Sequence, residues 1–151
     1  MYIELREIKE ANRAQCLALQ VEPEQARFVA TNEVSLQHAA ELPGIARPLG
    51  IYVDGTMVGF TLLAFDPEEG DWLWRIMLDQ AWQGQGLGNA AMKCILAYFQ
   101  KAGSRRGFLH VHPDNTRAYG LYRKFGFLPN GEVNDEEEVL TLELQGGEET
   151  K

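Results

Sequence analysis

Three glycines alternate with other residues at the point where a strand-like run gives way to a long amphipathic run. The segment reads Gln83-Gly84-Gln85-Gly86-Leu87-Gly88-Asn89. Because Leu87 to Ala102 repeats apolar residues on one helical face, the segment is predicted to join a strand to a helix. Backbone N–H groups at such a turn can point outward together, beside the positive end of the helix dipole. The junction therefore predicts a pyrophosphate cradle; a tight, closely packed turn is the alternative interpretation of the glycines alone.

The spacing of these glycines limits which nucleotide the cradle could hold. A Walker loop requires GxxxxGK[ST], and the chain contains no Gly-Lys pair. The dinucleotide fingerprint GxGxxG would require glycine at position 89, where the chain has Asn89. That fingerprint also belongs to an early strand of a parallel sheet, whereas this segment follows the fourth predicted strand. ATP hydrolysis and NAD binding are therefore disfavoured.

Hydrophobic periodicity and turn residues divide the rest of the chain into short elements. Asp54-Gly55 lies between two β-rich runs and predicts a tight hairpin. Ser35 is predicted to cap a helix that begins at Leu36. The predicted strands are 2–8, 49–53, 57–63, 72–79, 107–112, 127–133 and 139–144, and the predicted helices are 9–20, 24–30, 36–40, 87–102 and 115–125.

This order of strands and helices indicates the α/β (α+β) class, with helices covering a mixed sheet. The length of 151 residues fits one domain, 1–151. Its last residues, 145–151, are predicted to be a flexible tail. Edge strands or the C-terminal hairpin are the surfaces through which a homodimer could form.

Charge and composition exclude several classes of protein. The chain has 22 acidic and 14 basic residues, a net charge of −8, so it is a poor candidate for binding nucleic acid or an anionic membrane. No apolar run approaches the ~20 residues of a membrane span, and the first residues do not resemble a signal peptide. Cys16 and Cys94 are predicted to be buried thiols in a reducing compartment. We therefore expect a cytoplasmic protein.

A second informative segment lies near the C-terminus. It runs from Pro113 to Phe127 and contains Asn115, Tyr122 and Gly126. Taken separately, Asn115 or Asp114 is a helix cap and Tyr122 is a half-buried aromatic residue.

Together the two segments resemble the GNAT superfamily of acetyl-CoA-dependent N-acetyltransferases. Residues 83–88 match its [RQ]-x-x-G-x-[GA] loop, with Gln83 where arginine is frequent. The second segment matches N-x-x-A-x-x-L-Y-x-x-x-G-F through Asn115, Ala118, Leu121, Tyr122, Gly126 and Phe127. The resemblance covers 3–144 and implies a mostly antiparallel mixed sheet of about seven strands, flanked by helices, with a splayed central pair.

Within the superfamily, the chain is most similar to bacterial diamine and spermine/spermidine acetyltransferases. The residues that carry this narrower resemblance are Phe28-Val29-Ala30, Ser35-Leu36, 74–79 and Asn130-Gly131-Glu132. It implies that acetyl-CoA is the co-substrate and that the acceptor is a small primary amine, such as a polyamine or diamine. A protein or peptide amine, or a non-catalytic acyl-CoA sensor, are the alternatives. No metal is expected, although His110 and His112 share a strand face.

The resemblance also implies roles for individual residues. Met77 and Leu78 would lie along the pantetheine arm, Asn115 would contact it, and Lys124 would approach a phosphate or lie on a solvated helix face. Tyr122 would lie near the sulfur as the general acid, with Tyr119 as the fallback. The residues whose backbone would hold the pyrophosphate are Gln83, Gly84, Gln85, Gly86, Leu87, Gly88 and Asn89.

The chemistry requires two proton movements, because the attacking amine must lose a proton and the leaving thiolate gains one. Attack by the amine on the thioester is direct, so neither cysteine needs to be a nucleophile. The general base stays open among several carboxylates. Glu33 and Asp79 could also bind an acceptor ammonium, and Arg75 is predicted to make a structural ion pair. The other carboxylates considered are Asp66, Glu68, Glu69, Asp71 and Glu132.

Overall fold

A computed structural model describes residues 1–28 and 30–144 of the chain. Val29, named above for the narrower resemblance, and the predicted tail at 145–151 lie outside the described residues. The elements are β1 (Ile3–Glu7), α1 (Glu10–Ala18), η1 (Pro23–Phe28), α2 (Asn32–Ala40), β2 (Ala46–Val53), β3 (Thr56–Asp66), β4 (Gly70–Leu78), η2 (Gln80–Trp82), α3 (Leu87–Lys101), β5 (Arg106–Val111), α4 (Thr116–Lys124), β6 (Leu128–Asn134) and β7 (Glu137–Glu143).

The seven strands form one sheet in the order β1-β2-β3-β4-β5-β7-β6. Every neighbouring pair is antiparallel except β4 and β5, which run parallel. The predicted order of strands and helices and the predicted mixed, mostly antiparallel sheet are therefore confirmed. The homodimer stays a prediction; β1 and β6 are the edges, and every residue of β6 is exposed.

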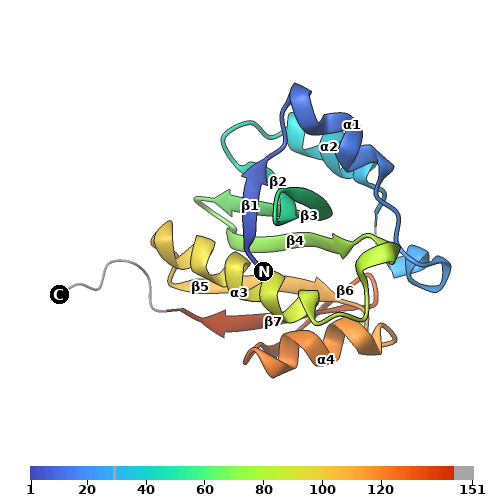
Figure 1. The fold of residues 1–151 in the computed structure, drawn as a ribbon. Coiled ribbons are helices and arrows are strands. Elements are labelled where there is room, and N and C mark those ends of the chain that lie inside the picture. The colour runs from blue at the N-terminus through green and yellow to red at the C-terminus, as the bar shows by residue number, and fades with distance from the viewer. Residues whose placement is uncertain (29, 145–151) are drawn as a thin grey trace.

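Helices cover both faces of this sheet (Figure 1). On one face α1 and α2 enclose a cluster that includes Cys16, Leu36, Phe60, Leu62 and Met77. On the other face α3 and α4 pack over the strands, and their cluster is Leu49, Leu63, Leu73, Met92, Ile95, Phe99, Leu109, Val111, Tyr122, Phe127 and Leu140. Among the described residues, no helix is long and apolar enough to cross a membrane.

Two predictions about the helical region before the hairpin are wrong in detail. The helix predicted at 24–30 is a 3₁₀ helix, η1, of six residues. Thr31, not Ser35, caps α2, because the Thr31 hydroxyl accepts a hydrogen bond from the Val34 backbone N–H at 3.2 Å. Ser35 is instead fully buried inside the helix, so its side chain is used for close packing and not for capping.

Both predicted hairpin turns form, and each uses left-handed backbone. At the first turn Asp54 has φ 49° and Gly55 has φ 87°, which matches the tight turn predicted for Asp-Gly. At the second turn Asp135 has φ 50° and Glu136 has φ 69°. Glutamate adopts this region at a cost, so the β6–β7 turn stores strain close to the start of β7.

One irregularity in the sheet creates the space for the site. Leu63 pairs with Leu73 and Leu62 pairs with Arg75, so Trp74 is an extra residue in β4, a β-bulge. The parallel ladder between β4 and β5 is short and pairs only residues 71–73 with 107–109. Beyond the bulge the two strands diverge, which confirms the splayed central pair.

Candidate active site

A cleft of about 750 Å³ lies where β4 and β5 diverge. Its walls come from the second half of β4, the end of β5, the glycine loop, α4, η1 and the start of β7. Most predicted site residues line this cleft: Met77, Leu78, Gln83, Gly84, Gly86, Leu87, Gly88, Asn89, Asn115, Tyr122 and Lys124. The splay therefore brings together two motifs that are far apart in the sequence.

The glycine loop is open toward the cleft. Gly84 and Gly86 both have φ 78°, and Gly86 is the left-handed residue immediately before α3. A Cβ built at either position meets no atom within 4 Å, so nothing covers this stretch of backbone. Fifteen residues of α3 follow, which places the positive end of a long helix dipole beneath the loop. The loop fits an anion such as a pyrophosphate.

Within the described residues, the second half of β4 pairs with no strand on the edge that faces the cleft. On the other edge β3 approaches closely, since a Cβ added to Gly59 would lie 2.5 Å from the Met77 carbonyl oxygen. Met77 is largely buried, and the Leu78 carbonyl accepts a hydrogen bond from the Gln83 side chain at 2.9 Å. Strand β4 thus offers an ordered, one-sided backbone edge on which an extended ligand could pair.

Tyr122 lies on the cleft wall with only 7% of its surface exposed. Its ring packs edge-on against Phe127 at 6.2 Å between centroids, and its hydroxyl makes no hydrogen bond to any described residue. Burial raises the pKa of Tyr122 well above its ordinary value, and the charge of Glu137 raises it further. The hydroxyl is therefore a proton donor throughout the neutral pH range.

Tyr119, the fallback acid, is committed elsewhere. Its hydroxyl donates a hydrogen bond to Glu138 Oε1 at 2.6 Å, and this bond is the main reason that its pKa is raised. Tyr119 is also absent from the residues that line the cleft. Of the two tyrosines, the geometry favours Tyr122.

Polar side chains connect the glycine loop to both neighbouring elements at the mouth of the cleft. Gln83 Nε2 donates to Gln25 of η1 at 3.1 Å, and Gln83 Oε1 accepts from Arg117 of α4 at 3.0 Å. Lys124 Nζ donates to Asn89 Oδ1 at 3.3 Å. Two cations therefore lie beside the loop, where they could approach phosphate groups, and Arg117 also forms an ion pair with Glu22 at 3.7 Å.

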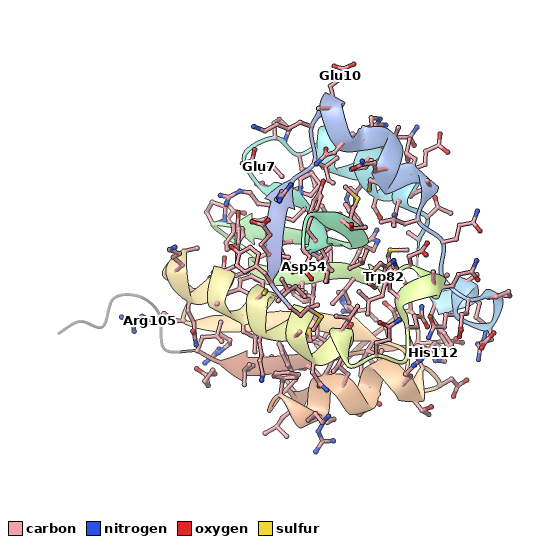
Figure 2. The ribbon with its side chains drawn as sticks, in the orientation of Figure 1. Glu7, Glu10, Asp54, Trp82, Arg105 and His112 are labelled. Carbon is pink, nitrogen blue, oxygen red and sulfur yellow. The ribbon has the colours of Figure 1, made fainter. Side chains whose placement is uncertain are left out.

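The opposite wall of the cleft carries residues to which the sequence assigned no substrate role. Arg75, His110, His112 and Glu137 all line it. Arg75 makes no ion pair within the described part of the chain, so the ion pair predicted for it is not found. Burial lowers the pKa of Arg75, and the charge of Glu137 opposes that effect. In Figure 2, His112 is labelled at the same end of the molecule as Trp82.

Three predicted site residues lie away from the cleft wall. Glu33 is exposed on α2, and the side chain of Gln85 is exposed beside η2, reaching the Ala81 carbonyl at 3.5 Å. Asp79 uses both carboxylate oxygens structurally, accepting from the Gln20 backbone N–H at 2.9 Å and from that of Ala81 at 3.1 Å. Among the described residues, no group of three or more His, Cys, Asp or Glu side chains could hold a metal ion.

Comparison with known proteins identifies the family. The family model described as Acetyltransferase (GNAT) family matches residues 6–127, which is most of the chain. The chain belongs to this family. It is an N-acetyltransferase of the GNAT type, and the resemblance carried by the two motifs is confirmed.

Individual relatives of this GNAT protein align with 95% of the chain. Spermine/spermidine N(1)-acetyltransferase of Bacillus subtilis (strain 168) is 31% identical over 153 aligned positions, which span 95% of this chain and 100% of the relative. The probable spermine N(1)-acetyltransferase of Bacillus subtilis subsp. natto has the same identity and coverage.

Solved structures share the fold at lower identity. Spermidine N-acetyltransferase from Vibrio cholerae, in complex with CoA and spermine, has a TM-score of 0.75 at 16% identity and covers 93% of this chain and 95% of that chain. An N-acetyltransferase from Thermoplasma acidophilum in complex with coenzyme A has a TM-score of 0.74 at 18% identity, with coverage of 95% and 99%. At these identities the likeness shows the fold alone.

Proposed function

We propose that this GNAT protein transfers the acetyl group of acetyl-CoA to a primary amine of a small polyamine or diamine. The observation that carries the proposal is that the glycine loop and Tyr122 line one cleft, opened by the divergence of β4 and β5. The acceptor class is supported by the full-length similarity to the spermine/spermidine N(1)-acetyltransferase of Bacillus subtilis.

Residues on the glycine-loop side of the cleft suit the phosphate and pantetheine parts of acetyl-CoA. The backbone N–H groups between Gln83 and Asn89 hold the pyrophosphate, with Arg117 and Lys124 as nearby cations. The open edge of β4 at Met77 and Leu78 pairs with the amides of the pantetheine arm. Asn115, which caps α4 and lines the cleft, contacts the same arm.

Tyr122 provides the acid for the reaction. Acetyl-CoA supplies a thioester, whose carbonyl carbon forms the new C–N bond with a neutral amine while the C–S bond breaks. The buried Tyr122 hydroxyl stays protonated and donates to the leaving sulfur, which stabilises the developing thiolate. After attack, the nitrogen releases its second proton, so that the amide product is neutral.

The acceptor is tested with a panel of amines and purified protein, with products identified by mass. The panel contains spermine, spermidine, putrescine, lysine, an aminosugar and a short peptide. Selective acetylation of the polyamines is the expected result. Selective acetylation of the peptide would replace the proposal with a protein acetyltransferase, and tight acetyl-CoA binding without any turnover would replace it with an acyl-CoA sensor.

A further inference from the structure

Glu137 occupies a distinctive position on the cleft wall. It is the first residue of β7 and is partly buried, and among the described residues that line the cleft it is the single acidic one. Its carboxylate makes no hydrogen bond or ion pair with another described residue. A partly buried carboxylate without a protein partner is available to bind a cation that enters the cleft.

The sheet register places Glu137 on the face of the sheet opposite to that of Glu138. The ladder between β5 and β7 ends at the pair Val111 and Glu138, and His112 and Glu137 are the next residues on the two chains. Successive residues of a strand face opposite sides of the sheet. Glu138 reaches Tyr119 of α4, so Glu137 and His112 face the other side, where the His112 ring lies 5.8 Å from that of Phe28 in η1.

Charge interactions connect Glu137 with Tyr122 and with Arg75. The Glu137 carboxylate acts on Tyr122 and on Arg75 of β4, although these three residues come from three different elements. The divergence of β4 from β5 removes the sheet backbone that would otherwise separate the two faces at this point. A ligand in the cleft could therefore contact Glu137 while its reacting end lies near Tyr122.

We propose that Glu137 binds a non-reacting ammonium group of the acceptor, so that the enzyme selects diamines and polyamines over monoamines. The inference rests on the proposed function and names the residue that determines the acceptor class. The chemistry favours this assignment, because a carboxylate stabilises the charged form of a nearby amine. It would oppose deprotonation of the reacting nitrogen, whereas the second nitrogen of a diamine stays charged throughout the reaction.

Arg75 offers the competing form of recognition. Arg75 lines the same cleft, so an acceptor that carries a carboxylate, such as an amino acid, could bind there instead. A polyamine gains nothing from Arg75, and Glu137 balances that positive charge. The two forms of recognition predict opposite preferences between a diamine and an amino acid, which an experiment can separate.

The test compares kcat/KM for putrescine and for butylamine, two acceptors that differ by a single ammonium group. The enzymes are the wild type, Glu137→Gln and the matched control Glu138→Gln, whose carboxylate faces α4. We expect the wild type and the control to prefer putrescine by about tenfold or more, as for a hydrogen bond to a charged group. In Glu137→Gln the preference falls to about onefold, through a higher KM for putrescine.

A binding measurement keeps the test independent of catalysis. Titration of putrescine into the CoA-saturated protein should give affinity in the wild type and in Glu138→Gln, and at least about tenfold weaker binding in Glu137→Gln. An unchanged putrescine preference in Glu137→Gln would overturn the inference, as would a wild type that prefers lysine and loses that preference in Arg75→Gln. Equal use of both amines by the wild type would overturn the inference alone, whereas failure to acetylate any amine would overturn the proposed function as well.

Discussion

At the scale of single residues, the protonation state of Tyr122 determines how the reaction should depend on pH. A general acid acts in its protonated form, and burial raises the pKa of Tyr122. The pH at which the acid is lost therefore moves upward. The attacking amine acts in its neutral form, and its fraction grows with pH up to a pKa of about 10.4.

We therefore predict that kcat/KM for spermidine rises continuously from pH 6 to about pH 10. The measurement is a steady-state pH profile with thiol release as the readout, and a pH-stability control is run at each point. A bell-shaped profile with a descending limb near pH 8 would show that the essential acid has a pKa well below that of an ordinary tyrosine, and so is not the buried Tyr122.

At the scale of structural elements, the glycine loop can be tested by substitutions that differ only in backbone conformation. Gly86 has φ 78°, a region that costs other residues roughly 1–2 kcal/mol. Gly88 lies in the first turn of α3, and a Cβ there would lie 3.6 Å from Leu121, an ordinary contact. We predict that Gly86→Ala raises the KM for acetyl-CoA by about tenfold, whereas Gly88→Ala changes it far less. Equal effects would contradict the specific role of the Gly86 turn.

The β6–β7 turn predicts a stabilising substitution. Glu136 has φ 69°, so Glu136→Gly relieves strain and should raise the free energy of unfolding by about 1 kcal/mol. The exposed contact of Glu136 with His112 at 3.6 Å contributes little, since exposed ion pairs are weak. Thermal unfolding should show a midpoint about 2–4 °C higher. The control is Glu132→Gly, the same change at exposed backbone without positive φ; an increase there too would argue against relief of strain.

Local patterns explain why some elements could be predicted from the sequence. Asp54-Gly55 specifies its turn by itself, and the glycines before Leu87 mark the beginning of α3 in the same local way. The helix type of η1 could not be predicted from the sequence, because a 3₁₀ helix and a short α-helix share their turn residues. The sequence does not distinguish Thr31 from Ser35 as the cap, because both side chains carry a hydroxyl that can accept a hydrogen bond. The burial of Ser35, which excludes it as the cap, depends on tertiary packing.

The cleft wall that carries Arg75 and Glu137 could not be predicted from the sequence. No motif marks these residues, and their positions depend on how the strands pair. Glu137 lies in a run of four acidic residues, 135–138, any of which could be solvated. Only the pairing of β7 with β5 shows that Glu138 faces α4 and Glu137 faces the cleft. The position of Arg75 also depends on strand pairing, since the bulge at Trp74 changes which face of the sheet the following residues occupy.

At the scale of the whole molecule, we propose that the described chain is a single folding unit, because its hydrophobic clusters share one seven-stranded sheet. Cys16 makes the stability of that unit depend on pH. Its thiol is fully buried, and burial raises its pKa from 9.0 to about 11. Above pH 9 the unfolded thiol loses its proton while the folded one keeps it, so rising pH favours unfolding.

We predict one cooperative unfolding transition whose free energy falls between pH 9 and pH 10 by up to about 1.4 kcal/mol from Cys16. The measurement is denaturant unfolding at several pH values, followed by circular dichroism and by tryptophan fluorescence. Cys16→Ala should be less stable at neutral pH but should lose less stability over this pH range. Separate transitions for the two probes would contradict the single unit, and an equal pH slope in the variant would contradict the role of Cys16.

The most direct test of the account is the rate of thiol release from acetyl-CoA with spermidine as acceptor, measured for the wild type and Tyr122→Phe together. The variant keeps the buried ring against Phe127 and removes only the hydroxyl. We predict turnover by the wild type and a kcat reduced by about 10²-fold or more in the variant, with acetyl-CoA binding and thermal stability retained. Equal rates for the two proteins would contradict the assignment of Tyr122 as the acid in the cleft between β4 and β5.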